Sequence, residues 1–217
     1  MEVECRTAFY GMMLTHFQGR WVNHPAADIR ADNKLAQLQA AHATGWTIPQ
    51  TLVSSEPDEI RAFVRRLNGV AIVKVVRGIP EIPVPTWQVS LEDLTDDSAL
   101  QACPAIYQEL IAGNQHLRIH VFGTDVFAVQ IQAEHLDWRP HLNAPMEAYP
   151  LPEAWAARCR ALTRHLGLEM GIIDAKLDQE GQLIFLEINP QGQFLFMEAL
   201  AKTPIASRMA SFLTAET

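Results

Sequence analysis

The side chains of Asp174, Glu187 and Asn189 place two carboxylates and an amide oxygen on two neighbouring stretches of the sequence. No histidine or cysteine stands beside them, so a site built from them would offer oxygen ligands only. Such ligands suit a hard cation, and Mg²⁺ in particular takes its remaining ligands from water and substrate phosphates. The three residues therefore predict a magnesium site that serves nucleotide chemistry. The alternative is that Glu187 and Asn189 are solvated residues at the end of a strand, where Asn-Pro forms a turn.

These side chains share one site only if the strands that carry them pair in the right register. The sequence GIIDAKLDQEGQLIFLEIN is typical of a hairpin around Asp178–Gly181. With a loop of two or four residues, Asp174 faces Phe185 and Ile172 faces Glu187. Period-two alternation then puts the odd-numbered residues of the second strand on one face and its even-numbered residues on the other. The three polar side chains would project to the same side, and a loop one residue longer would separate them.

Positively charged residues at three places could meet an anionic ligand. Lys74 lies in VAIVKVV, an otherwise apolar run that predicts a strand, and a buried ammonium costs free energy unless an anion or carboxylate meets it. A phosphate is a good candidate partner, and the alternative is an edge strand whose lysine reaches water. Arg118 opens a further strand, and Arg139 stands in LDWRP. For each arginine, the alternative is an ordinary surface ion pair.

The segment YQELI, Tyr107–Ile111, predicts a strand end in which a polar pair is followed by apolar residues. Such a segment can offer backbone donors and acceptors to the edge of a purine, while aliphatic side chains cover the faces of the ring. It is therefore a candidate nucleobase site. The alternative is that its aliphatic residues belong to the hydrophobic core.

The composition limits the kinds of partner. The 217 residues include 17 Lys and Arg against 25 Asp and Glu, a formal charge of -8, so a basic surface for nucleic acid is not expected. Cys5, Cys103 and Cys159 stand far apart without a CxxC pair, which argues against a zinc site or a disulfide framework and indicates reduced thiols. The N-terminus lacks the basic start of a signal peptide, and no apolar run approaches the roughly 20 residues of a membrane span. We therefore predict a cytoplasmic protein without a nucleic-acid or membrane partner.

Helices and hairpins interleave along the chain. The spacing of apolar residues predicts helices over Asp28–Ala43, Ser55–Leu67, Ala154–Leu166 and Pro204–Leu213. Glycines that can end a helix follow the first three, at Gly45, Gly69 and Gly167. LRIHVFGTDVFAVQIQ predicts two strands joined at Gly123–Asp125. Because the hairpins are mostly antiparallel, the expected fold class is α+β in two lobes.

Taken in order, these segments resemble the ATP-grasp fold, and more closely the ATP-grasp maturases of ribosomal peptides, the microviridin or graspetide ligase type. The matching segments span Trp21 to Ala206 and are WVNHPAADIRADNKLAQLQAAHATGWTIPQTLV, AIVKVV, PAIYQELI, HLRIHVFGTDVFAVQI, LDWRP and GIIDAKLDQEGQLIFLEINPQGQFLFMEALAKTPIA. The last is the most specific. That family uses ATP and Mg²⁺ to activate a carboxylate as an acyl phosphate, which an amine or hydroxyl then attacks. The resemblance implies two α+β lobes with mostly antiparallel sheets that hold ATP between them.

The resemblance also implies roles for individual residues. The implied metal ligands are Asp174, Glu187 and Asn189. The implied nucleotide-binding residues are Lys34 and Lys74, at the phosphates, and Gln108, Glu109, Leu110 and Ile111, the hinge that holds adenine. The implied catalytic residues are Arg118, which faces the γ-phosphate or acyl phosphate, and Arg139, near the phosphates or the acceptor carboxylate. His116 stands where an acidic residue is frequent in the family.

The same resemblance divides the chain into three parts. Residues 1–45 form an N-terminal helical segment, residues 46–111 the small lobe, and residues 112–217 the large lobe with the metal site. The loop Arg77–Trp87 is the expected lid, because an acyl phosphate must be kept from water. The family's usual N-terminal α/β domain has no match in this sequence, so the assemblies considered are a homodimer and a complex with a separate chain that supplies that domain.

The expected activity is that of a carboxylate-amine or carboxylate-alcohol ligase acting on an acidic peptide or a small carboxylate. The leading hypothesis is maturation of a ribosomal precursor peptide through side-chain amide or ester links. One alternative is a RimK-like ligase that adds a free amino acid or small amine. Another is a subunit that binds nucleotide or peptide without catalysis.

Overall fold

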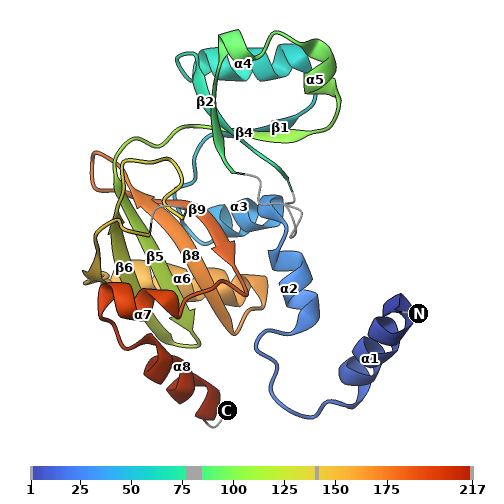
Figure 1. Ribbon diagram of the computed structural model, residues 1–217, viewed down its shortest axis with the longest axis vertical. Helices are drawn as coiled ribbons and strands as arrows, with labels where there is room; N and C mark the ends of the chain where they lie inside the picture. The colour runs from blue at the N-terminus through green and yellow to red at the C-terminus, as the bar shows by residue number, and fades with distance from the viewer. Residues whose placement is uncertain (1, 77–84, 140–141, 216–217) are drawn as a thin grey trace.

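The computed structural model describes residues 2–76, 85–139 and 142–215. Within these ranges the chain forms two β-sheets of antiparallel strand pairs, with helices packed against both (Figure 1). One isolated parallel bridge, from Thr47 to Ile184, connects the segment before the smaller sheet to the last strand of the larger one. The expected α+β class with mostly antiparallel sheets is confirmed.

The smaller sheet lies at the top of Figure 1. Its strands follow the order β1 (Thr51–Ser54), β4 (Ala105–Gln108), β2 (Val70–Lys74) and β3 (Trp87–Ser90). The helices beside it are α4 (Pro57–Arg66), α5 (Asp97–Gln101) and the short 3-10 helix η1 (Leu91–Asp93). Helix α4 buries Ile60, Phe63 and Val64 because these residues recur at helical spacing on one side. They form the core of this part of the molecule.

The larger sheet is covered by helices on both faces. Its strands follow the order β7 (Met146–Tyr149), β6 (Asp125–Gln132), β5 (Gln115–Phe122), β8 (Met170–Leu177) and β9 (Leu183–Asn189). One face shares a core with α2 (Pro25–Ala31), α3 (Lys34–Ala43) and α6 (Glu153–Leu166), and the other with α7 (Phe196–Ala201) and α8 (Ile205–Thr214). Alternation along β5 places Leu117 and Ile119 in the first core and His116 and Arg118 on the other face.

Local turn and cap signals are confirmed where the sequence is most specific. Strands β5 and β6 meet at Gly123-Thr124, since Phe122 pairs with Asp125. Helix α6 ends at Gly167, whose φ of +76° lies in the left-handed region that glycine adopts readily. The predicted C-terminal helix corresponds to α8.

The single helix predicted over Asp28–Ala43 is wrong, because the chain forms two helices there. The break falls at Asn33, whose extended backbone and side chain cap the start of α3. Its Oδ1 accepts hydrogen bonds from the backbone nitrogens of Leu35 at 2.9 Å and Ala36 at 3.1 Å. The apolar stripe continues across the break, which is why the pattern alone suggested one helix. The break makes Lys34 the first residue of α3.

The predicted register of the β8–β9 hairpin is also wrong. The loop holds five residues, 178–182. Next to it, Lys176 pairs with Ile184, whereas the predicted register pairs each even-numbered residue of β8 with an odd-numbered residue of β9. A β-bulge between Asp174 and Ala175 on β8 then takes up Leu186 on β9, so that Asp174 faces Glu187 directly. Strict odd and even alternation on β9 therefore fails, and both Leu186 and Glu187 line the same pocket.

Helix α1 (Glu2–His16) lies apart from both sheets in Figure 1. It contains no buried residue, and apolar side chains such as Val3 and Phe9 are more than half exposed. The described ranges contain no helix with the length and apolar character needed to cross a bilayer.

Candidate active site

The candidate metal ligands share one face of the larger sheet. Asp174 and Glu187 are directly opposed, and Asn189 follows two residues later on β9, opposite Ile172. The five-residue loop alone would have sent Glu187 to the opposite face, and the bulge at Leu186 restores the shared face. Two carboxylates and an amide oxygen on one face fit a hard cation. In the part of the chain that the structure describes, no group of three or more Asp, Glu, His or Cys side chains is placed to hold a metal, so water and substrate would have to complete the coordination.

Arg118 neutralises Asp174 from the neighbouring strand β5. Its Nη1 donates to both oxygens of Asp174, at 2.9 and 2.8 Å, and its Nη2 donates to the carbonyl of Gln193 at 2.7 Å. The indole of Trp138 lies 5.5 Å from the guanidinium carbon. Burial raises the pKa of Asp174 above its ordinary value, although Arg118 opposes that rise. Arg118 therefore lies behind Asp174 and is not among the residues that line the pocket.

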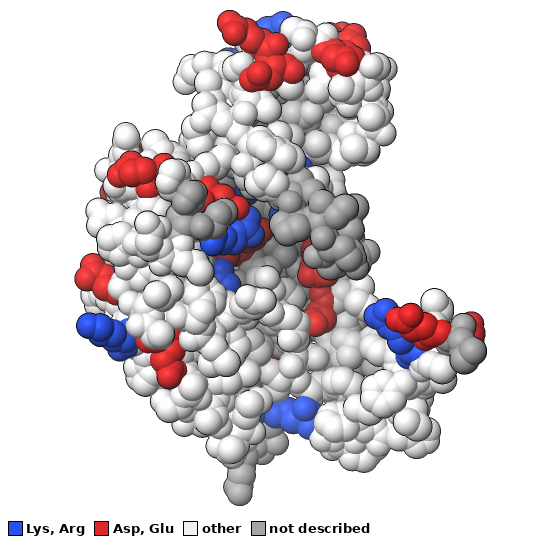
Figure 2. All heavy atoms as spheres, viewed as in Figure 1, with Lys and Arg blue, Asp and Glu red and all other residues white. Residues whose placement is uncertain are grey.

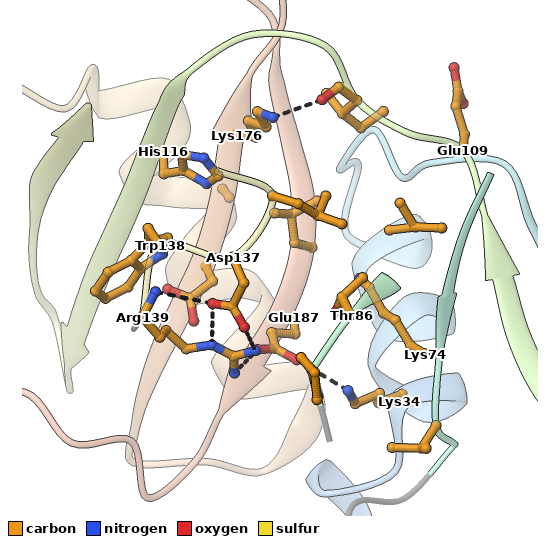
Figure 3. A pocket seen from close by; sticks show the side chains of 18 residues that line it. Lys34, Lys74, Thr86, Glu109, His116, Asp137, Trp138, Arg139, Lys176 and Glu187 are labelled. Atoms are coloured by element: carbon orange, nitrogen blue, oxygen red, sulfur yellow. Dashed lines mark hydrogen bonds and ion pairs between the residues drawn. The ribbon is translucent and has the colours of Figure 1, made fainter. Parts of the chain in front are cut away.

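Glu187 is held between two cations. The Nζ of Lys34 lies 3.4 Å from one of its oxygens, and Nη1 of Arg139 lies 3.6 Å from the other. Figure 3 shows Lys34 and Arg139 approaching this carboxylate from different sides of the pocket. Burial acts to raise the pKa of Glu187, but Lys34, Lys74 and Arg139 together hold it below its ordinary value. Glu187 is thus kept as the carboxylate that a metal ion requires.

Arg139 is oriented by Asp137, two residues before it. Its Nε and Nη2 donate to the two oxygens of Asp137 at 2.8 and 2.7 Å, a bidentate pair that fixes the plane of the guanidinium. The hydrogen bonds to Asp137 raise the pKa of Arg139, so it remains charged. The sequence LDWRP therefore provides a carboxylate that aims the arginine, as well as the arginine itself.

Lys74 enters the same pocket from β2 of the smaller sheet. Its Nζ donates to Oε1 of Gln108 at 2.9 Å, and Nε2 of Gln108 donates in turn to the hydroxyl of Thr51 at 2.9 Å. Burial lowers the pKa of Lys74 to about 8. The side chain of Gln108 therefore orients Lys74 within the sheet and is not part of the pocket lining.

Helix α3 is clamped to β9 next to the carboxylates. The buried side chain of Gln37 donates from Nε2 to the carbonyl of Ile188 at 2.8 Å, and its Oε1 accepts from the nitrogen of Ile188 at 3.1 Å. Because Gln37 lies one turn after Lys34, this double contact fixes the lysine beside Glu187.

The pocket lies where the two sheets meet, and Figure 2 shows acidic and basic side chains side by side in a hollow of the surface there. Of the residues predicted from the sequence, seven line it: Lys34, Lys74, Glu109, Ile111, Arg139, Asp174 and Glu187. Asn189 lies beyond them at the end of β9, where its Oδ1 accepts from the nitrogen of Gln191. Leu110 lines a neighbouring smaller pocket together with Glu109 and Ile111. The predicted lid lies largely in residues 77–84, outside the described residues, and Pro85 and Thr86 line the pocket.

The sequence interpretation missed Asp137 and Lys176 as site residues. Lys176 lines the pocket and donates from Nζ to the carbonyl of Ile111 at 2.8 Å. It follows Asp174 by two residues in a predicted strand, so alternation could have placed it on the same face. Asp137 had a signal of a different kind, since it is the acidic residue of LDWRP.

Comparisons with known proteins point to one group of enzymes. No protein-family model matches the chain. The structure is similar to that of macrocyclase MdnC bound with precursor peptide MdnA from Microcystis aeruginosa MRC, with a TM-score of 0.87 and 32% identity over 98% of this chain and 70% of that one. It is also similar to ATP-grasp ligase PsnB complexed with a phosphomimetic variant of a minimal precursor, Mg and ADP, with a TM-score of 0.81 and 25% identity over 97% of this chain and 68% of that one.

A curated relative carries a different name. The chain is 28% identical over 221 aligned residues to a probable alpha-L-glutamate ligase of Sodalis glossinidius, covering 96% of this chain and 74% of the relative. The peptide macrocyclase and the glutamate ligase both match nearly the whole of the present chain.

Proposed function

The chain belongs to the ATP-grasp ligase family that includes these peptide macrocyclases, and on this premise we propose that it uses ATP and Mg²⁺ to join a carboxylate to an amine or a hydroxyl. The carboxylate would be an Asp or Glu side chain of a precursor peptide, and the product a side-chain amide or ester. The observation that carries the proposal is the direct opposition of Asp174 and Glu187 beside the cations Lys34, Lys74 and Arg139.

In this proposal the nucleotide lies in the pocket between the small lobe, residues 46–111, and the large lobe, residues 112–217, with residues 1–45 leading into the fold. Glu109 and Ile111 contact the base, with Gln108 and Leu110 completing the hinge. Asp174, Glu187 and Asn189 would hold Mg²⁺, which supplies charge neutralisation at the phosphates. Lys34 and Lys74 bind the phosphates, because each presents an ammonium to the pocket.

The reaction proceeds in two steps. A carboxylate oxygen of the substrate attacks the γ-phosphorus of ATP, and ADP leaves. The amine or hydroxyl then attacks the acyl carbon, and phosphate leaves as the new C–N or C–O bond forms. Arg139 stabilises the negative charge that develops on the transferred group. Arg118, which the sequence resemblance placed at the acyl phosphate, acts instead through Asp174, which it holds in place from behind. Pro85 and Thr86, at the end of the predicted lid, stand where water must be excluded.

A second candidate is a ligase that adds free glutamate or another small amine to its substrate. The similarity to the probable alpha-L-glutamate ligase favours this alternative. The two activities differ in the mass of the product, because an internal link removes one water from the peptide, whereas addition of an amino acid increases its mass.

The test is to incubate the protein with ATP, Mg²⁺ and an acidic peptide encoded beside its gene, and to measure ADP and the mass of the peptide. The expected result is ADP together with the loss of one water per link. Glu187→Gln should stop ADP formation, whereas Glu180→Gln, a matched change in the exposed loop 178–182, should not. Binding of ATP without turnover of any acidic peptide or small amine would contradict the proposal.

The same variant tests how Glu187 acts. With Mg²⁺ removed by a chelator, Glu187→Gln should bind ATP more tightly than the wild type, since Lys34 and Arg139 no longer face a carboxylate. Calorimetric titration measures the difference, with Glu180→Gln as the control. Equal or weaker binding of metal-free ATP would show that Glu187 does not restrain these cations.

A further inference from the structure

Lys176 is a buried cation that forms no ion pair in the described residues, and the carboxylate that acts on it, Glu134, does so from beyond ion-pair distance. Only 6% of its surface is exposed, and no carboxylate in the described part of the chain lies within the 4.0 Å of an ion pair. Its hydrogen-bond acceptor in the described part of the chain is the carbonyl of Ile111, at 2.8 Å. An ammonium carries three N–H donors, so two of them have no acceptor among the described groups. A buried charge in this state costs free energy unless a ligand meets it.

The neighbour of Lys176 across the strands is also incompletely paired. His116 on β5 stands directly opposite Lys176, just as Arg118 stands opposite Asp174. His116 is 4% exposed, and its Nε2 has no hydrogen-bond partner among the described residues. Both His116 and Lys176 line the pocket (Figure 3). The row Arg118–Asp174 is internally neutral, whereas the row His116–Lys176 leaves polar atoms without hydrogen-bond partners among the described residues.

The position of Lys176 indicates which part of a nucleotide it would meet. Lys34, Arg139 and Glu187 gather at one end of the pocket, as Figure 3 shows, and Lys176 lies at the other, where its Nζ donates to the carbonyl of Ile111. The aliphatic side chains of Ile72 and Leu186 line the same pocket and are suited to the faces of a flat ring. A purine offers ring nitrogens that accept hydrogen bonds and a π-face that attracts a cation.

We propose that Lys176 is a base-binding residue, which contacts the purine ring of the nucleotide and at the same time fixes the Ile111 carbonyl of the hinge. This inference rests on the proposed function, because it requires a nucleotide in the pocket. It assigns base recognition to a side chain of the larger sheet in addition to the hinge segment, and it accounts for a lysine in a buried strand without a paired acid.

The test compares ligands with and without a base. Lys176→Met keeps a long aliphatic side chain and removes the charge, and Arg65→Met, an exposed change on α4, is the matched loss of a positive charge outside the pocket. Binding of Mg-ATP and of magnesium with inorganic tripolyphosphate is measured by calorimetry. Because a hydrogen bond from a charged group contributes more binding free energy than a neutral one, Lys176→Met should weaken ATP binding roughly tenfold or more. Tripolyphosphate binding should not change.

Each other outcome overturns the inference. Equal weakening of both ligands would mean that Lys176 acts through charge at the phosphates, and unchanged ATP binding would mean that it does not touch the base. A circular dichroism spectrum and thermal midpoint of Lys176→Met near those of the wild type exclude misfolding. Lys176→Gln keeps a hydrogen-bond donor, so it should bind ATP better than Lys176→Met. A wild-type protein that binds tripolyphosphate but no nucleotide would contradict the inference, whereas one that binds neither would remove the proposed function itself.

Discussion

At the scale of single residues, the carboxylates expected to bind Mg²⁺ are paired with cations expected to serve the phosphates. Asp174 is paired with Arg118, and Glu187 lies between Lys34 and Arg139. Charge is therefore nearly balanced without any ligand, which lowers the cost of keeping so many ionised groups in a partly buried pocket. Lys74 is the exception, since its hydrogen-bond acceptor is the neutral amide of Gln108.

This difference predicts a pH dependence. Because burial lowers the pKa of Lys74 to about 8, its ammonium is lost in the folded protein as the pH rises through about 8. ATP affinity should therefore fall above pH 8, by up to roughly tenfold per pH unit. The guanidinium of Lys74→Arg stays charged, so the ATP affinity of this variant should stay level from about one pH unit below the pKa of Lys74 to about one unit above it. Calorimetric titration with ATP across this pH range measures both proteins.

The stability should change in the opposite sense. The unfolded chain keeps a proton on Lys74 up to its ordinary pKa of 10.5, whereas the folded chain releases it near 8. The unfolded state thus binds more protons between these values, and the free energy of unfolding gains a contribution from Lys74 as the pH rises. If the wild-type ATP affinity is as flat through pH 8 as that of Lys74→Arg, the ammonium of Lys74 does not titrate near pH 8 or does not bind ATP.

At the scale of elements, the loop after β9 fixes Arg118 and is itself tightly packed. A Cβ atom at Gly192 would lie 2.9 Å from Cβ of Ile172, so Gly192→Ala should push the loop away from the sheet. We expect the free energy of unfolding to fall by about 1–3 kcal/mol and turnover to fall with it, because the loop carbonyl of Gln193 binds Arg118. Denaturant unfolding and ADP release measure the two effects.

Gly11→Ala is the matched control for this change. Nothing lies within 4 Å of a Cβ atom at Gly11, in the exposed helix α1, so the same substitution should be neutral or stabilising by up to about 1 kcal/mol. If both variants unfold like the wild type, the loop does not depend on the absence of a side chain at Gly192.

The elements also show where sequence reasoning succeeded and where it failed. The turn at Gly123–Asp125, which the structure confines to Gly123-Thr124, and the cap at Gly167 were predicted because a turn or cap depends on nearby residues alone. The bulge at Leu186 was missed because it depends on pairing with a strand and not on a local sequence signal. The break at Asn33 was missed although its signal is local, since Asn is a favoured N-cap residue and the apolar spacing was given more weight. The shared face of Asp174 and Glu187 was reached with the wrong register, since the longer loop and the bulge compensate for each other. The three-part division of the chain and the roles of the site residues stay predictions.

At the scale of the whole molecule, the two sheets and their helices carry the buried core, and α1 adds nothing to it. Removal of residues 2–16 should therefore change the free energy of unfolding by less than about 1 kcal/mol. Phe212→Ala is the contrasting change: this side chain of α8 is 8% exposed and stacks on Phe122, so its loss should cost about 3–5 kcal/mol. Urea unfolding compares them. Loss of a cooperative transition on removal of α1 would show that this helix supports the fold.

The clamp between Gln37 and Ile188 has a consequence for solubility. Strand β9 is the last strand of its sheet, and such an edge normally exposes backbone N–H and C=O groups that can pair with another chain. Here Gln37 satisfies both backbone groups of Ile188, and the nitrogen of Phe185 donates to the carbonyl of Thr47 at 2.9 Å. The Gln37 contacts that hold Lys34 beside Glu187 therefore also cover this edge, and they prevent the edge-to-edge strand pairing that leads to aggregation.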